Sequence, residues 1–592
     1  MRIRDYYRNR KNQMITAVFL ITVFIACVPL ISRYCINGHD LEYHLLRIES
    51  LKEGIRIGKP FLKVNTLFFG NAGYASSMFY PDFLLYIPAL FRVLGVSINA
   101  SYHIFAAVCI ILCYLSTYFC VKCMSGSAYG GMIAAITLSL CQYHLDDIYV
   151  RSAVGEYTAF IFIPIVIYAI YNVIYEEADK PQLLILGFAG VLLCHTSTFV
   201  MCTVFGIAAL LINFRKTIGN IRILRRLSVI TVITLLLTCF YWLPMLEQFM
   251  NARFYVSTPW MQPGDEAVEF INIFGAQFPS LGCICVLMLI PRIFMRKYAV
   301  SGRSVEDTKK EIKEGILPEQ DRQKIDMLGY ADLLIFAGAL FTVITSDLMP
   351  WERIGRYVSF IQFPWRFFIM GSALFSVATG LIYSRICGSD DEMTEIMTFN
   401  NEANTRVVNA GAVILATVLI INGISAFNIL KKGSQGYYDY SDDYYSYKPY
   451  TSNVIAGEWL PDTVTDRDKL IDDSERMTAG NGEMLDFVRV ENTIEADIDG
   501  NYEYVDVPFI YYLGYRAELS DDTGKTTILP VTGEGENGMS RVYMQGHDKG
   551  RLKVGYYGTR IMHISVFISI ITMLAAAVLF IIRKKRMPKK HE

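Results

Sequence analysis

The sequence predicts a mainly α-helical, polytopic membrane protein with about twelve transmembrane helices and a small extracytoplasmic β-rich domain. Its 592 residues are 53% hydrophobic and only 19% charged, with a mean hydropathy of +0.32. Long apolar runs recur along the chain, as spanning helices require, because lipid cannot hydrogen-bond the backbone. A polar, acidic block interrupts them near the C-terminus. The net charge of −1 offers no basic stripe, so we do not expect nucleic acid as a partner.

Each expected span is a predominantly apolar run between polar turns. The first run is long and lacks the small-residue exit of a cleaved signal peptide, so we expect it to remain as a span. The later runs are separated by short turns, and the last one precedes a basic tail. The expected spans are 14–31, 101–121, 128–141, 157–175, 182–195, 197–214, 227–246, 273–294, 332–347, 366–386, 407–427 and 561–582.

Basic residues in short flanks predict the orientation, because Lys and Arg are retained on the cytoplasmic side. They gather in the N-terminal segment, in 215–226, in 296–310 and in the C-terminal tail. Twelve spans bring all four segments to one side of the membrane. We therefore expect a multi-pass protein of the cytoplasmic membrane with both termini in the cytoplasm and with membrane lipids as its surroundings.

This topology predicts three parts. Residues 1–427 form a transmembrane module with a long first outer loop at 32–100, and 561–592 form the last span and the cytoplasmic tail. Residues 428–560 form the extracytoplasmic domain, which holds 24 acidic and 14 basic residues and no cysteine. Short β-forming runs such as 503–507 and 551–556 between Gly and Asp turns predict strands there.

The first outer loop carries the strongest candidate residues. On a helix, Asp40, His44 and Arg47 fall on one face at i, i+4 and i+7, while leucine and isoleucine form another. A carboxylate beside His39, His44 and Arg47, with Glu42 nearby, suits general-base catalysis or a divalent ion held against phosphate oxygens. We expect Asp40 to be catalytic, with Glu42 and His44 beside it. A helix-capping Asp with solvated neighbours is the alternative, which leaves His39 and His44 unexplained.

The second outer loop repeats this mixture. Asp146, Asp147, Arg151 and Glu156 lie between two expected spans, so they are candidates for completing a metal or phosphate site. A solvated turn that caps a helix is an equal alternative. His195 lies where two short spans reverse, and a packing or capping role is the alternative for it.

Two arginines near a later outer turn are candidates for binding a lipid phosphate. Arg356 and Arg366 lie at expected membrane depth, and the planar guanidinium group suits phosphate. Snorkelling arginines are the alternative. The centres of the apolar runs contain almost no ionisable residues, which ion-coupled transporters generally need. The predicted chemistry therefore lies at the outer surface.

Several runs together resemble a family of bacterial polytopic membrane proteins labelled as 6-pyruvoyl-tetrahydropterin synthase-related. The pterin part of that label is not carried over, because the sequence shows no soluble three-histidine zinc enzyme. The runs that carry the resemblance are 39–49, Gly73-Tyr74, 79–82, 151–156 and 362–366.

The layout is also similar to that of GT-C glycosyltransferases, in which a first span leads into a long outer loop with an acidic motif. This resemblance implies a sugar transferred from a polyprenyl-phosphate donor to an acceptor on the outer side. Asp40 then matches the first-loop acid, Asp146 or Asp147 the second acid, and Arg356 or Arg366 the group that binds the lipid phosphate. Leu41 separates Asp40 from Glu42, where the superfamily often has adjacent acids, so the need for Mg or Mn at Asp40, Asp146 and Asp147 stays open.

The sequence thus predicts an integral-membrane glycosyltransferase acting on an envelope glycan or polymer. In that function, His39, Arg47, Arg151, Glu156, His195, Arg356 and Arg366 are the candidates for binding substrate or lipid phosphate. A transporter or flippase of a lipid-linked saccharide and a non-catalytic envelope scaffold are the alternatives.

Overall fold

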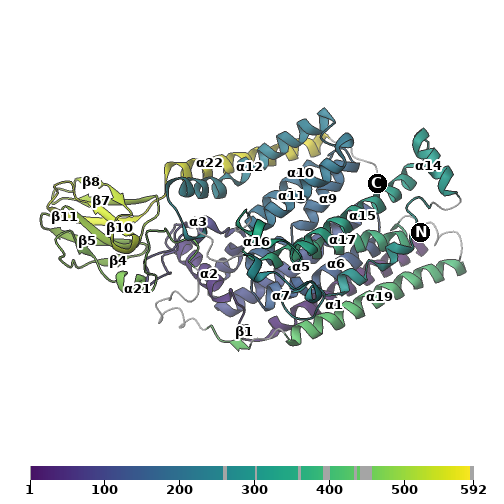
Figure 1. Cartoon of the computed structure of the whole chain (residues 1–592), viewed down its shortest axis with the longest axis horizontal. Helices are drawn as coiled ribbons and strands as arrows, with labels where there is room; N and C mark the ends of the chain where they lie inside the picture. Colours follow the sequence, from purple (N-terminus) through teal and green to yellow (C-terminus); the bar gives the residue numbers. More distant parts are fainter. Residues whose placement is uncertain are drawn as a thin grey trace. The chain divides into compact units, whose positions relative to one another are not determined.

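The computed structural model is mostly helical, with two β-sheets near the C-terminus (Figure 1). It forms two compact units. Unit 1 consists of Met1–Leu41, Tyr102–Thr231 and Met261–Asp439, and unit 2 of Glu42–Ser101, Val232–Trp260 and Tyr440–Glu592. The structure describes residues 2–257, 263–299, 303–357, 362–390, 401–432, 436–440 and 457–586.

Unit 1 is a bundle of apolar helices. Two short strands, β1 (Cys35–Ile36) and β2 (Tyr437–Tyr438), pair antiparallel within it. Its helices are α1 (Arg2–Cys27), most of α5 (Ile98–Ser125), α6 (Ala128–Ser139), α7 (Gln142–Tyr149), α8 (Val154–Ala159), α9 (Ile163–Tyr175), α10 (Pro181–Leu192), α11 (Thr196–Ile212), the start of α12 (Ile221–Asn251), α13 (Ile284–Leu287), α14 (Val305–Glu314), α15 (Glu319–Ile344), α16 (Trp351–Ile354), α17 (Phe368–Cys387) and α19 (Asn401–Lys432).

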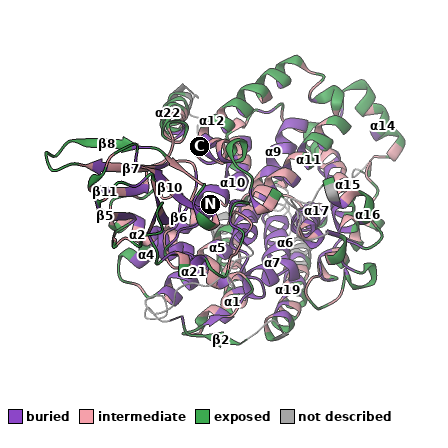
Figure 2. Ribbon diagram, turned by 60° about the vertical axis from the view of Figure 1, so that its left-hand side comes forward, coloured by how far each residue is buried: buried purple, intermediate pink, exposed green. Residues whose placement is uncertain are grey.

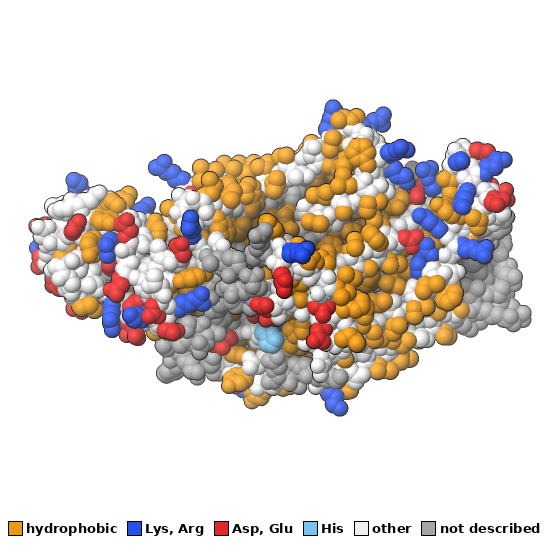
Figure 3. Space-filling view, viewed as in Figure 1, with side chains coloured by type: hydrophobic (Ala, Val, Ile, Leu, Met, Phe, Trp, Pro, Cys, Tyr) orange, Lys and Arg blue, Asp and Glu red, His pale blue; other side chains and the backbone are white. Residues whose placement is uncertain are grey.

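Eight helical segments in the described residues are long and apolar enough to cross a membrane. They are Lys11–Ile31, Ile98–Ser125, Val154–Tyr175, Ile221–Asn251, Glu319–Ile344, Pro364–Cys387, Ala410–Lys431 and Arg560–Leu579. In the space-filling view, apolar side chains cover the flanks of the helices, and Lys and Arg gather around α14 (Figure 3). The expectation of a multi-pass, mainly helical chain is confirmed at this level.

The count of twelve spans is not confirmed. The expected spans at 128–141, 182–195, 197–214 and 273–294 correspond to shorter apolar helices. α6 and α10 have 12 residues each, so they rise about 18 Å, against about 30 Å of hydrocarbon. Apolar composition does not report where a helix ends, so the number of full crossings stays a prediction.

α6 and α17 are two largely enclosed helices of unit 1 (Figure 2). Every residue of α6 is buried. A Cβ added to Gly130 would lie 2.6 Å from the Gly380 carbonyl oxygen, so the two backbones pass closer than any other residue permits. Small residues at such a crossing let the helices approach closely, so that van der Waals packing holds them together where lipid provides no hydrophobic effect between helices. This packing holds the C-terminal half of α17 against α6.

Unit 2 combines helices with the β-rich block, which confirms the predicted C-terminal β structure. The units cut across the boundaries expected at 427 and 560, because the first outer loop groups with the β strands. Its helices are most of α2 (Leu41–Arg56), α3 (Ser76–Phe79), α4 (Tyr86–Val93), the rest of α12, α21 (Leu470–Asp473) and α22 (Arg560–Arg586).

Two antiparallel sheets form the β structure. One has the order β3-β6-β10-β9 and the other β4-β5-β11-β7-β8. Alternate residues of β5 and β11 point inward, as a half-buried strand requires: Ile494, Leu552 and Val554 are buried. The strands are β3 (Thr478–Ala479), β4 (Val488–Val490), β5 (Thr493–Asp499), β6 (Tyr504–Ile510), β7 (Tyr515–Ser520), β8 (Thr526–Leu529), β9 (Val531–Thr532), β10 (Met539–Tyr543) and β11 (Lys549–Tyr556).

Candidate functional site

Two short helices, α7 and α8, bring the polar residues of the second outer loop into the interior of unit 1. The chain turns between them at Ser152, which has a φ of +55°. This tight reversal brings the Arg151 side chain within hydrogen-bond distance of Asp147 and of Glu156, which lies in the first turn of α8. All residues of α7 and α8 are buried, so the alternative of a solvated turn is wrong.

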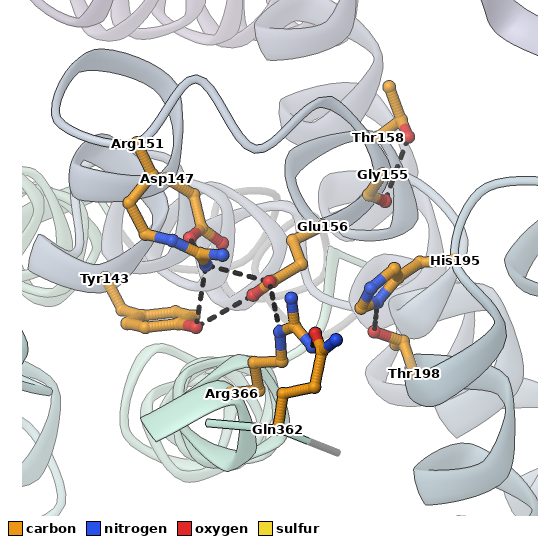
Figure 4. A network of polar contacts seen from close by, with 10 residues as sticks. All are labelled: Tyr143, Asp147, Arg151, Gly155, Glu156, Thr158, His195, Thr198, Gln362 and Arg366. Carbon is orange, nitrogen blue, oxygen red and sulfur yellow. Dashed lines mark hydrogen bonds and ion pairs between the residues drawn. The ribbon is translucent and has the colours of Figure 1, made fainter. Parts of the chain in front are cut away.

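A carboxylate and two arginines form the centre of the site (Figure 4). Arg151 Nη1 donates to Glu156 Oε1 over 2.8 Å and to Asp147 Oδ1 over 2.9 Å. Arg366 Nε donates to the same Glu156 oxygen over 3.1 Å. The Tyr143 hydroxyl donates to Glu156 Oε2 over 2.8 Å. Arg366 comes from the 3-10 turn η10 (Pro364–Phe367), so residues far apart in sequence meet on one carboxylate.

Two acids beside this centre have unpaired oxygens. Asp146 Oδ2 and Asp147 Oδ2 are buried and have no hydrogen-bond partner among the described residues. Burial raises the pKa of Asp146 to about 8, against opposing effects of a Gln142 hydrogen bond and Arg151. Burial, and next the charge of Glu156, raise the pKa of Asp147 well above its usual value. Burial therefore favours the neutral form of both acids.

Asp40 is tied to this region through the backbone. Its N–H donates to the Arg151 carbonyl oxygen over 2.8 Å, and the His39 N–H donates to the Val150 oxygen over 3.1 Å. A Cβ on Gly38 would lie 2.1 Å from Ser152 Oγ, so this close approach requires glycine. Asp40 is half-buried and His39 is exposed. The structure thus brings together the two outer loops that carry the acids.

His195 lies on the other side of the same carboxylate (Figure 4). It is the residue before α11, and its ring is buried with Nδ1 2.8 Å from Thr198 Oγ1. The charges of Glu156, Arg366 and Arg151 all act on the ring. The side chain therefore belongs to the polar cluster and makes no capping hydrogen bond to the backbone of α11.

Three residues from the predicted set lie in unit 2, because the unit boundary falls after Leu41. Glu42 is half-buried in the first turn of α2. His44 and Arg47 are buried instead of facing water. Arg47 donates to the carbonyl oxygens of Tyr80 and Pro81 over 3.1 and 2.8 Å, pairs with Asp82 and contacts His44 Nδ1 at 3.2 Å. These contacts tie α2 to the segment before α4.

The remaining predictions concern a second arginine and a metal. Arg356 lies in the 3-10 turn η8 (Gly355–Tyr357), and its side chain is outside the described residues. Within the described part of the chain, no group of three His, Cys, Asp or Glu side chains is arranged to hold a metal ion. Asp40, Asp146 and Asp147 are therefore not a ready-made ligand set.

The sequence reasoning did not select Tyr143, Gln362 or Thr198. Tyr143 precedes Asp147 by one helical turn, so helical spacing was an available signal for it. Gln362 Oε1 accepts from Arg366 Nη1 over 2.9 Å and adopts a φ of +61°. Thr198 contacts His195 Nδ1 three residues before it, so its place in the cluster follows from that of His195.

Comparisons with known proteins give a family match and weak structural likenesses. Residues 14–291, just under half of the chain, match a family model described as a family of unknown function (DUF6541). No curated protein matches the sequence. This family model carries no pterin label, so the resemblance to 6-pyruvoyl-tetrahydropterin synthase-related proteins stays a prediction.

The solved structures that are similar to this chain include three membrane transferases. The arabinofuranosyltransferase AftD from Mycobacteria has a TM-score of 0.44 and 12% identity over 73% of this chain and 28% of its own. ArnT from Cupriavidus metallidurans bound to undecaprenyl phosphate has a TM-score of 0.39 and 11% identity over 71% and 75%. The oligosaccharyltransferase from Archaeoglobus fulgidus in complex with Zn and sulfate has a TM-score of 0.37 and 12% identity over 72% and 54%.

The chain spans less than a third of the length of AftD. Likenesses at these scores assign neither a function nor a ligand to the chain, so its activity is argued from its own residues.

Proposed function

We propose that this protein is an integral-membrane glycosyltransferase of GT-C type. It transfers a sugar from a polyprenyl-phosphate donor to an envelope glycan or polymer on the outer face of the cytoplasmic membrane. The observation that carries the proposal is the convergence of Arg151 and Arg366 on Glu156, inside an apolar bundle and beside the backbone of Asp40.

The charges of this cluster suit a phosphate. Arg151 and Arg366 share one oxygen of Glu156, and burial together with the Glu156 charge favours the neutral form of Asp147, the other acid that Arg151 contacts. With Asp147 neutral, the buried centre carries one more positive than negative charge. Arginine binds phosphate through a planar pair of donors, and fixed charges act strongly where water is excluded. The two arginines would hold the lipid phosphate as it leaves the sugar.

Asp40 is the proposed base. It is half-buried beside the arginine cluster, which leaves its carboxylate accessible to an acceptor hydroxyl. In the reaction, the acceptor oxygen bonds to the anomeric carbon while the bond to the phosphate oxygen breaks. Asp40 takes the hydroxyl proton, and the polyprenyl phosphate departs with the bonding electrons. General-base assistance of this kind accelerates a reaction by about 10² to 10⁴.

The membrane arrangement belongs to the same proposal. With the basic flanks inside, both termini are cytoplasmic and the site faces outward. No step is assigned to a divalent cation, although unpaired oxygens of Asp146 and Asp147 are the atoms that would contact one. Glu42 and His44 remain proposed catalytic residues beside Asp40, and Arg47 and Arg356 remain proposed residues for binding substrate or lipid phosphate.

The test is the Asp40→Asn protein in lipid nanodiscs, incubated with a panel of polyprenyl-phosphate sugars and envelope glycan acceptors. The measured quantity is released polyprenyl phosphate. We expect the rate to fall by about 10² to 10⁴. Asp265→Asn, which changes an exposed acid of the 3-10 turn η5 (Pro263–Glu266), is the matched control and keeps the wild-type rate.

Undiminished transfer by Asp40→Asn would refute the base assignment. Wild-type protein that transfers no sugar but moves lipid-linked saccharide across a vesicle bilayer would favour the transporter alternative.

A further inference from the structure

Four aromatic rings form a continuous arc at the border of this site. His39 and Phe278 have ring centres 6.0 Å apart, and Phe278 and Trp365 have centres 5.8 Å apart, both edge to face. Trp365 stacks on Phe363 at 4.4 Å. The rings come from three separate segments of unit 1. These four residues are called the aromatic arc below.

The arc runs between the two chemically important ends of the site. At one end, His39 directly precedes Asp40 and is joined through its backbone to Val150. At the other end, the Arg366 guanidinium lies 5.0 Å from the Phe363 ring centre while it donates to Glu156. A group held along the arc would therefore lie between the proposed base and the proposed phosphate site.

Trp365 has an unused hydrogen-bond donor. Its side chain is 9% exposed, and its Nε1 has no partner among the described residues. Trp351 is equally buried in the same unit, but its Nε1 donates to the Ser346 carbonyl oxygen over 2.9 Å. A buried indole N–H normally finds a partner, and one without a partner calls for an explanation. An oxygen atom of a ligand would supply it.

The arc also has accessible ring surface. Phe278 and Phe363 are half-buried and His39 is exposed, so the arc is not sealed inside the protein core. The face of an aromatic ring is electron-rich and attracts weakly positive hydrogens, including the C–H groups on the apolar side of a hexose. The hydroxyl groups of the same sugar accept hydrogen bonds from N–H donors. Rings together with one free donor are the combination that a sugar requires.

We propose that the aromatic arc binds the hexose ring of the lipid-linked donor, with a sugar hydroxyl accepting a hydrogen bond from Trp365 Nε1. The identity of the ligand rests on the proposed function. The sugar would lie over Phe278 and Phe363, next to the phosphate held by Arg366. The sugar then faces Asp40, which takes the proton of the acceptor hydroxyl. This assigns a role to the 362–366 motif that the phosphate contact alone leaves unexplained.

Two substitutions test the arc by binding instead of turnover. Trp365→Phe keeps a ring and removes the N–H, and Phe363→Leu keeps an apolar side chain and removes the ring. Binding of undecaprenyl-phosphate glucose, galactose and mannose to the full-length protein in nanodiscs is measured by calorimetry. Undecaprenyl phosphate alone is the sugar-free probe. The ratio of the two dissociation constants reports what the sugar contributes.

We expect wild-type protein to bind at least one sugar-bearing lipid more tightly than the sugar-free lipid. Trp365→Phe should reduce that preference by about 5- to 10-fold, as the loss of one hydrogen bond does. Phe363→Leu should reduce it by about 2- to 10-fold. Trp365→Phe should leave the affinity for undecaprenyl phosphate alone unchanged.

The matched control is Trp351→Phe, which removes a satisfied N–H instead of a free one. It should lower thermal stability and leave the sugar preference unchanged, whereas Trp365→Phe should not lower stability. If the wild type lacks a preference for sugar-bearing lipid, or if both arc variants retain it, the arc only packs and the inference is overturned. A preserved preference without any sugar transfer would instead refute the proposed enzyme and leave the arc as a sugar-binding site.

Discussion

Replacing Glu156 with glutamine tests the charge balance of the site. The substituted side chain keeps nearly the same shape and one carbonyl oxygen, but Arg151 and Arg366 lose the negative charge they share at 2.8 and 3.1 Å. Glu156 is 1% exposed, so water cannot replace that charge. Removing one partner of a buried ion pair costs about 3–5 kcal/mol. We expect a loss of folding stability of this size.

An anion should restore part of this loss. In Glu156→Gln, the cluster gains one positive charge, so a phosphate that enters the site is held more tightly than in the wild type. A ligand at 100 times its dissociation constant stabilises the folded state by about 2.7 kcal/mol. Undecaprenyl phosphate should therefore raise the melting temperature of the variant more than that of the wild type.

The assay is thermal unfolding in detergent, followed by intrinsic fluorescence with and without undecaprenyl phosphate. Glu352→Gln is the control, because Glu352 is exposed in α16 and its replacement should change stability by less than about 0.5 kcal/mol. If Glu156→Gln melts with the wild type, or if the lipid stabilises both proteins equally, the charge argument for a phosphate site is refuted.

Two further predictions concern the surroundings of the site. The folded protein holds a proton on Asp146, whose pKa is about 8, whereas the unfolded chain releases this proton near pH 4. Wild-type stability should therefore fall as the pH rises between these two values. Melting curves from pH 5 to 9 should show a smaller fall for Asp146→Asn, and identical slopes would contradict the raised pKa. Gly130→Ala should lower the folding stability by about 1–3 kcal/mol in the same melting assay, because the added Cβ would clash with the Gly380 oxygen. Gly206→Ala is the control and should be neutral or stabilising, because the nearest atom to its added Cβ is 3.5 Å away. Equal melting temperatures of the two variants would refute the close crossing.

The sequence anticipated much of the fold because each element has a local signature. An apolar run of about 20 residues needs no partner to be recognised as a possible crossing, and eight of the twelve expected runs are long apolar helices. The β-forming runs at 503–507 and 551–556 likewise indicated strands. The four other runs form helices too short to count as full crossings, since hydropathy does not locate the turn that ends a helix.

The candidate site was only partly predictable. Asp147, Arg151 and Glu156 lie within ten residues of one another, so their grouping was visible in the chain. Arg366 was selected as a phosphate ligand, but its contact with Glu156 across 210 residues is a product of packing. Phe278 was not selected, and Trp365 was noted only within the 362–366 run, because an aromatic residue near a membrane has the same local signature whether it anchors, packs or binds.

By itself, the sequence indicated that the protein lies in a membrane, which parts are helical or β-rich, and which chain segments carry acids and arginines. Those properties follow from local composition and spacing. The tertiary structure decided that Asp146, Asp147 and Glu156 are buried. It also decided that Arg47 pairs with Asp82 and contacts His44 within unit 2, and that His39 and Arg366 lie at opposite ends of one aromatic arc. Charge neutralisation and ring contacts act over a few ångströms in space, and only the folded chain sets those distances.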